Sequence, residues 1–466
     1  MNIPSNWKNT TIGAICETTS GGTPDRDRED YYGGNISWLK SGELEDGRIT
    51  QAEESISQTG LENSSAKIIP KDTLLIALYG ATAGKVGVLK FESAVNQAIC
   101  AITTPQNLRD DFLFYYLIYF RNDLRAKRSG GAQLNLSQGK IKSTTIPLPP
   151  LGEQQRIVAK IEELFSKLDS GISELEEAKA QANGYRKAIL EQAIWGVLTG
   201  NWRQENPKLA NPRELIMNPS EYSPPDGSDL PDIPEDWILA TFGDVFEVYL
   251  GSTPKRSNDE YWGGDIHWIS SGEVEFSRIK DSEETITQAG LESCSTTLHP
   301  PNTVLLGIIG QGKTRGRAAI LDIEAAHNQN TVAIRPKEAG ISAKYIYYFF
   351  MENYERTRRL GSGNQQKALS KTRVQNMVFP LPPVEEQNRI ADILDQNLSI
   401  IEKIEQSVET NIERASRLRQ SILKHAFEGN LVPQEPTEDP RTPDGGDTKL
   451  EPGEQATLSE VISNVE

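Results

Sequence analysis

SGGTPDRDREDYYGGNISWLKSGEL, residues 20–44, recurs as LGSTPKRSNDEYWGGDIHWISSGEV, residues 250–274. A second pair of matching stretches follows in the same order, IPLPPLGEQQRI at 146–157 and FPLPPVEEQNRI at 379–390. Two long matches that keep their order indicate an internal repeat rather than chance similarity. The chain of 466 residues is therefore expected to fold as two similar units.

The two copies also share their internal order. Each opens with short strand-like segments that are separated by turns rich in glycine and aromatic residues. A helix with many aromatic residues follows, at 110–128 and at 342–360, and then a segment rich in glycine and glutamine leads to Pro-Leu-Pro-Pro, where the module ends. This mixture predicts an α+β fold class, with one domain at 1–150 and a second at 233–383.

A long amphipathic helix is expected after each domain, at 151–198 and at 384–430, because apolar residues recur there at three- and four-residue steps. One such helix cannot bury its apolar stripe alone, whereas an antiparallel coiled coil of the two would bury both stripes. The alternative is that each helix packs on its own domain. Pairing predicts a pseudo-two-fold molecule with these residues at the helix interface: Ile161, Leu164, Leu168, Leu175, Leu394, Ile401, Val408 and Ile412.

The remaining segments are polar. Residues 199–232 are rich in proline and predict a linker, and residues 431–466 are rich in acids, proline and glycine, which predicts an acidic disordered tail. The chain has no apolar run long enough to span a membrane, and its first ten residues lack the pattern of a signal peptide. Three scattered cysteines fit a reducing compartment, so we expect a cytoplasmic protein that does not bind membranes.

The stretch GIIGQGKT, residues 307–314, matches the pattern of a phosphate-binding P-loop. Such a loop must lead from a strand into a helix, but the residues after Lys313 and Thr314 predict a hairpin into a second strand. The first copy has ALYGATAGK at 77–85 in this place, without the pattern. We therefore expect a flexible cationic hairpin, and a P-loop NTPase that uses Lys313 and Thr314 is the alternative from another functional class.

The sequence offers no candidate catalytic residue or metal site. Its four histidines are scattered, and its cysteines do not pair at the spacing of a metal site. It also lacks the glycine-rich cofactor loop and the Asn/Asp-Pro-Pro-aromatic turn of an adenine methyltransferase. The net charge of −17 argues against a protein that coats nucleic acid without sequence preference. The chemistry that remains is selective binding.

Basic and amide side chains are concentrated on glycine-bearing loops of both copies. Arginine and lysine neutralise phosphates, and arginine, glutamine and asparagine can read base edges in the major groove. The alternative for each residue is an ordinary solvated surface charge. The candidate DNA-binding residues are Arg26, Arg28, Lys40, Arg48, Lys85, Arg125, Lys127, Arg128, Gln133, Lys255, Arg256, Lys313, Arg315, Arg317, Arg358, Arg359, Gln365, Gln366 and Lys367.

These residues and motifs resemble a known family, the DNA specificity (S) subunits of type I restriction-modification enzymes. The resemblance rests on the two repeated stretches quoted above and on the helix ends AIWGVLTGNWRQENP, 193–207, and AFEGNLVPQEP, 426–436. It covers residues 1 to 432 and leaves out the acidic tail. The second helix end departs from the pattern, because it has VPQEP where the first has WRQENP.

The resemblance implies a subunit without catalysis of its own. Residues 1–150 and 233–383 would be target-recognition domains, each reading one half of a bipartite, asymmetric site in double-stranded DNA. The paired helices would fix the length of the unspecific DNA between the two half-sites. Methyltransferase subunits with S-adenosylmethionine would dock on the helices, and restriction-translocase subunits would supply ATP and magnesium chemistry. No cofactor is expected on this chain. The alternative is a specificity module of a methylation-only or phage-defence system.

Overall fold

The computed structural model describes residues 3–126, 135–216, 230–310, 313–338, 340–359 and 368–434. The chain divides into two compact units: unit 1 combines Met1–Leu175 with Glu409–Glu466, and unit 2 is Glu176–Val408. Each long helix therefore contributes one half to each unit. None of the described helices is both long and apolar enough to cross a membrane. The expected acidic tail lies outside the described residues from position 435 onward.

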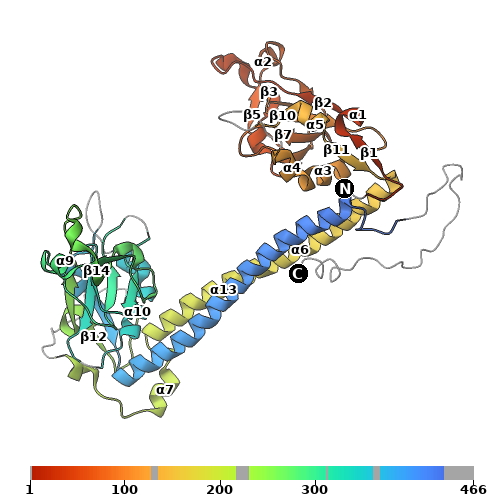
Figure 1. The fold of residues 1–466 in the computed structure, drawn as a ribbon. Coiled ribbons are helices and arrows are strands. Elements are labelled where there is room, and N and C mark those ends of the chain that lie inside the picture. The colour runs from red at the N-terminus through yellow and green to blue at the C-terminus, as the bar shows by residue number, and fades with distance from the viewer. Residues whose placement is uncertain are drawn as a thin grey trace. The chain divides into compact units, whose positions relative to one another are not determined.

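Unit 1 contains two main sheets and a small one (Figure 1). The five-stranded sheet has the order β2 (Glu17–Ser20), β10 (Ile99–Thr103), β7 (Leu74–Ala77), β8 (Val86–Leu89) and β4 (Gly47–Ile49). The four-stranded sheet has the order β5 (Glu54–Ile56), β3 (Tyr32–Leu39), β9 (Ser93–Val95) and β6 (Ile68–Ile69). The first and last strands of the domain, β1 (Lys8–Thr11) and β11 (Thr145–Leu148), pair antiparallel. The short helices are α1 (Ile12–Ile15), α2 (Gln58–Glu62), α3 (Asp110–Tyr119), α4 (Arg121–Ala126) and α5 (Gln138–Lys142).

Unit 2 repeats this arrangement. Its five-stranded sheet has the order β13 (Phe246–Leu250), β20 (Thr331–Pro336), β17 (Val304–Gly307), β18 (Ala318–Leu321) and β15 (Arg278–Ile279). A second sheet contains β16 (Glu284–Ile286), β14 (Trp262–Ile269) and β19 (Ala325–His327), and β12 (Ile238–Thr241) pairs with β21 (Val378–Leu381). Its short helices are α7 (Gly200–Glu205), α8 (Phe242–Val245), α9 (Gln288–Glu292), α10 (Ala343–Glu352), α11 (Tyr354–Arg359) and α12 (Lys371–Gln375).

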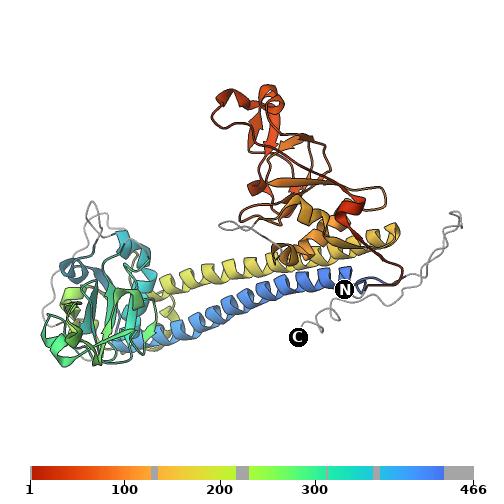
Figure 2. The same ribbon diagram turned by 45° about the horizontal axis from the view of Figure 1, so that its top comes forward.

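The two long helices are α6 (Leu151–Ile194) and α13 (Val384–Phe427), and they lie side by side in both views (Figures 1 and 2). In unit 1 the buried face of α6, including Ile161, shares a core with Phe427 at the far end of α13. In unit 2 the end of α6, including Ile194, shares a core with Leu394 near the start of α13. The predicted antiparallel pairing is therefore confirmed, and each helix also packs on its own domain at its first half.

A buried glutamate ties each long helix to the start of its domain. Glu153 of α6 accepts a hydrogen bond from the indole of Trp7 (3.0 Å), and Glu386 of α13 accepts one from Trp237 (2.8 Å). Arg203 of α7 adds an ion pair to Glu386 at 2.7 Å. Since a buried carboxylate is costly without hydrogen bonds, these contacts explain why tryptophan near the domain start and glutamate after Pro-Leu-Pro-Pro recur together.

Candidate nucleic-acid interface

In unit 1 three loops and the end of the glycine- and glutamine-rich segment are joined by backbone hydrogen bonds. The N–H of Gly22 donates to the carbonyl of Val95 (3.0 Å), which joins the Thr23 loop (residues 21–25) to the Gln97 loop (95–98). Leu78, at the base of the β7–β8 hairpin, donates to Ala98 (2.8 Å) and accepts from Leu136 (2.9 Å). The four segments therefore form one continuous surface, which we call the loop surface.

Unit 2 builds the same loop surface with the same bonds. Ser252 N–H donates to His327 (3.0 Å), which joins the Thr253 loop (251–255) to the Gln329 loop (327–330). Ile308 donates to Asn330 (2.8 Å) and accepts from Leu369 (2.9 Å). The glycine- and glutamine-rich segments themselves contain the candidates Lys127, Arg128, Gln133, Gln365, Gln366 and Lys367, which lie outside the described residues.

The P-loop pattern of unit 2 lies on the hairpin between β17 and β18, two antiparallel strands. Gly316, where a P-loop would have its helix, has a φ of +86°, and Gly84 of unit 1 has +82°. These positive values suit a tight turn and not the first turn of an α-helix. The predicted hairpin is confirmed, so Lys313 and Thr314 lack the helix N-terminus that a phosphate-binding loop requires.

The helix that follows each aromatic helix fixes the hairpin. In unit 1 the guanidinium of Arg125, on α4, donates to the carbonyl of Ala83 (2.8 Å). In unit 2 the hydroxyl of Tyr354, on α11, donates to the carbonyl of Lys313 (2.6 Å), and Arg358 donates to that hydroxyl (2.6 Å). Two candidate DNA-binding arginines therefore help to hold the hairpin in place.

The basic residues of the hairpins differ in accessibility. Lys313 is exposed, whereas Arg315 is only 8% exposed. Arg317 forms an ion pair with Glu275 at 2.9 Å. Lys85, on the hairpin of unit 1, is half-buried. In the described part of the unit 2 hairpin, Lys313 therefore offers its charge most openly to a ligand.

A second group of candidates lies on the loops that flank β3 and β14. The guanidinium carbon of Arg26 lies 4.6 Å from the ring centroid of Tyr32, and that of Arg256 lies 4.0 Å from Trp262. Both arginines form ion pairs on the neighbouring strand, Arg26 with Glu54 and Arg256 with Glu284. Both units keep the arginine, its aromatic neighbour and its acidic partner. This favours a role of the two arginines in stabilising the common fold. The other candidates of this region are Lys40, paired with Glu53 and Glu54, Arg28, paired with Asp30, and the exposed Lys255.

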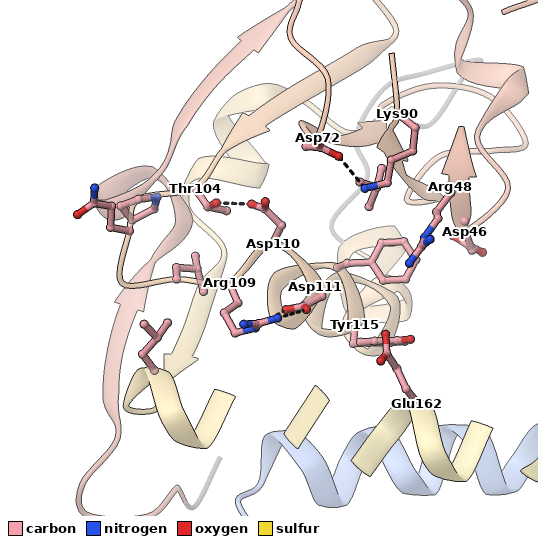
Figure 3. A pocket seen from close by; sticks show the side chains of 17 residues that line it. Asp46, Arg48, Asp72, Lys90, Thr104, Arg109, Asp110, Asp111, Tyr115 and Glu162 are labelled. Carbon is pink, nitrogen blue, oxygen red and sulfur yellow. Dashed lines mark hydrogen bonds and ion pairs between the residues drawn. The ribbon is translucent and has the colours of Figure 1, made fainter. Parts of the chain in front are cut away.

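Arg48 lies apart from the loop surface, in a hollow of about 770 Å³ beside the starts of α3 and α6 (Figure 3). The hollow contains the ion pairs of Lys90 with Asp72 and of Arg109 with Asp111, at 2.7 and 2.6 Å. Further carboxylates line it, so an anionic DNA backbone is disfavoured there. These carboxylates are Asp46, Asp110 and Glu162. The last candidate, Arg359, is exposed at the end of α11.

Each loop surface also carries a polar pair that the sequence did not indicate. The hydroxyl of Thr23 donates to Oε1 of Gln97, and that of Thr253 donates to Oε1 of Gln329. Both glutamines are exposed. The signal was present, because Asn-Gln follows a buried strand in both copies, but a lone neutral glutamine carries no charge pattern that would single it out.

Two histidines that are distant in sequence also lie together in unit 2. The ring centroids of His299 and His327 are 5.1 Å apart, and both side chains are buried. The sequence had indicated scattered histidines, whereas the bridge between His299 and Ala325 brings them together. Within the described residues, no three histidine, cysteine or carboxylate side chains gather as metal ligands.

Comparisons with known proteins agree with this architecture. A family described as "Type I restriction modification DNA specificity domain" matches residues 4–180 and 234–414. The type I restriction enzyme EcoKI specificity subunit of Escherichia coli K12 is 23% identical, over 94% of this chain and 92% of the relative. The EcoBI specificity subunit of Escherichia coli is 25% identical, over 74% and 71%.

Solved structures show the same fold. The HsdS subunit from Thermoanaerobacter tengcongensis is 21% identical and covers 92% of this chain and 98% of its own, with a TM-score of 0.56. A chain from a study of the assembly and conformational transition of the type I R-M system is also 21% identical, with a TM-score of 0.71, and covers 92% and 100%.

Proposed function

Since this chain belongs to the family of type I restriction modification DNA specificity domains, we propose that each of its loop surfaces reads one half of a bipartite DNA target. The observation that supports this proposal most directly is the duplication of the loop surface on two units with separate hydrophobic cores. A protein that bound one compact ligand would need one such surface. Two surfaces on one chain suit a target with two parts.

The target is expected to be asymmetric. The hairpins have the same backbone support, but the sequence ATAGK at 81–85 in unit 1 is replaced by KTRGR at 313–317 in unit 2. The side chains that reach base edges decide which bases are accepted, so different side chains on equal scaffolds should select different sequences. The two half-sites are therefore expected to differ.

The proposal also includes partners. Methyltransferase subunits, with S-adenosylmethionine, and restriction-translocase subunits, with ATP and magnesium, would carry out the reactions, and this chain would select the DNA. The relatives are specificity subunits of type I restriction enzymes, which supports this division of labour. We further propose that α6 and α13 provide the surface for the methyltransferase and set the length of the unspecific DNA between the half-sites.

Methylome sequencing of a host without other DNA methylation, carrying the complete system, tests the proposal. We expect one asymmetric bipartite motif to be methylated, and we expect this methylation to disappear when the coding sequence of this chain alone is deleted. Methylation that persists without this chain, or a target with one continuous part, would contradict the proposal. Cleavage of unmethylated DNA by the purified complex separates a restriction system from a methylation-only system.

A further inference from the structure

The Thr–Gln pairs of the two loop surfaces are the same in chemistry and in setting. In each unit the threonine hydroxyl holds the glutamine by its carbonyl oxygen, Thr23 with Gln97 and Thr253 with Gln329. The amide nitrogens of both glutamines make no hydrogen bond within the described residues, and both side chains are exposed. Each pair therefore presents two N–H donors to solvent in an orientation fixed by the threonine.

The backbone around each pair leaves little freedom. A Cβ atom added to Gly21 would lie 1.8 Å from the carbonyl oxygen of Val95, and one added to Gly251 would lie 2.2 Å from that of Asn328. Only glycine permits such a close approach of the two loops. The loop that carries the threonine and the loop that carries the glutamine are therefore in direct backbone contact in both units.

We propose that Gln97 and Gln329 each donate a hydrogen bond to a phosphate oxygen of the DNA backbone, one in each half-site. The proposal rests on the proposed function and adds the contact that positions each unit on the duplex. A group that offers free donors requires an acceptor, and a phosphate oxygen is an acceptor at every position of the DNA. The two units differ at the hairpins but keep this pair, so the pair should contact a group that both half-sites share, whatever their bases.

This contact differs from those of the basic candidates in a measurable way. A lysine or arginine that contacts phosphate releases a counterion, so its loss lowers the salt dependence of binding. A neutral amide releases none. Loss of Gln97 should weaken binding to cognate and random-sequence DNA by the same factor, about fivefold for one neutral hydrogen bond, and leave the salt slope unchanged.

The test uses the complex of the full chain with its methyltransferase subunits and two duplexes, one with the target found by methylome sequencing and one of random sequence. Gln97→Ala and Gln329→Ala should show the uniform loss. Gln97→Glu keeps an acceptor for the Thr23 hydroxyl but turns oxygens toward the phosphate, so affinity at low salt should fall by at least about tenfold. Gln106→Glu adds the same charge at an exposed position beyond the end of β10 opposite the Gln97 loop, and it should bind like the unchanged protein.

A methylphosphonate scan identifies the contact directly, because it removes the charge of one phosphate at a time. The unchanged complex should lose affinity at each contacted phosphate, and one of these phosphates in each half-site should be the partner of the glutamine. Gln97→Ala should become insensitive to that substitution in the first half-site only, and Gln329→Ala in the second only. Melting temperatures equal to that of the unchanged complex would show that the variants are folded.

Three results would overturn the inference. The first is that Gln97→Glu and Gln329→Glu bind with the affinity of the unchanged complex, and the second is a loss of affinity that depends on one base pair of the target. The third is that the alanine variants stay sensitive to methylphosphonate at every phosphate to which the unchanged complex is sensitive. If the unchanged complex binds both duplexes equally, the proposed function itself fails. If it prefers its target and the glutamine variants do too, with unchanged affinity, only the phosphate contact fails.

Discussion

His299 and His327 are buried in unit 2 at positions that unit 1 fills with Ile69 and Val95. Burial lowers the pKa of His299 to about 4 and that of His327 to about 3, and the charge of Arg335 or of the neighbouring histidine acts in the same direction. Both imidazoles are therefore neutral in the folded protein at pH 7. In an unfolded chain they would take up protons near pH 6.5.

We predict that unit 2 loses stability in acid because of this histidine pair. The folded pKa values lie below the unfolded value, so the full stability is present above pH 6.5 and falls as the pH drops toward 4. The free energy of unfolding should be several kcal/mol lower near pH 4 than at pH 7. Thermal unfolding from pH 7 to pH 4 measures it, with His299→Ile and His327→Val combined as the comparison. An equally steep decline in the double variant would show that other groups cause the acid sensitivity.

Lys313 allows a separate test of the unit 2 hairpin. If its exposed ammonium group contacts phosphate, Lys313→Ala should weaken binding to all sequences alike and lower the salt slope by about one. Lys280 is exposed directly after β15, beside the end of β18 that lies away from the hairpin, so Lys280→Ala is a matched control. Equal salt slopes for Lys313→Ala and the unchanged protein would remove Lys313 from the interface. ATP hydrolysis by the purified chain that disappears in Lys313→Ala would instead support the alternative of a P-loop NTPase.

At the scale of elements, the sequence predicted the two long helices and the hairpin well because their signals are local. The helices expected at 110–128 and at 342–360 are each divided in two, α3 and α4 in unit 1 and α10 and α11 in unit 2. The three- and four-residue spacing of apolar residues indicated α6 and α13, and the comparison of the two copies indicated a hairpin after Gly307. The division of each helix between two cores was not predicted. Periodicity shows that a stripe is buried, but it does not show which part of the chain covers it.

Neighbouring residues on α13 provide a matched test of the helix pairing. Ile401 is 2% exposed, whereas Ile400 is 56% exposed. Ile401→Asp would place an unpaired carboxylate in the core of unit 2 and should cost several kcal/mol of stability, while Ile400→Asp should cost less than about 0.5 kcal/mol. Urea unfolding measures both. Equal urea midpoints of unfolding for the two variants would mean that the side chain of Ile401 is not buried in solution.

For the whole molecule, the division into units gives a prediction about specificity. A chimera that replaces residues 233–383 with those of a relative keeps α6, α13 and the whole of the first domain. We expect its methylation target to change in one half and to keep the other half, because each loop surface would read its own half-site. The reciprocal exchange of residues 1–150 is the control and should change the other half. A target altered in both halves by either exchange would show that the units do not read DNA independently.

The sequence by itself determined the repeat, the α+β class, the two long helices and the absence of a P-loop context, because these depend on residues that are close in the chain or equal between the copies. Only the tertiary structure decided which polar groups meet. It paired Arg26 with Glu54, placed His299 beside His327, and joined Thr23 to Gln97. Such contacts join distant segments, and their geometry follows from the packing of whole sheets and loops, which no local spacing of residues encodes.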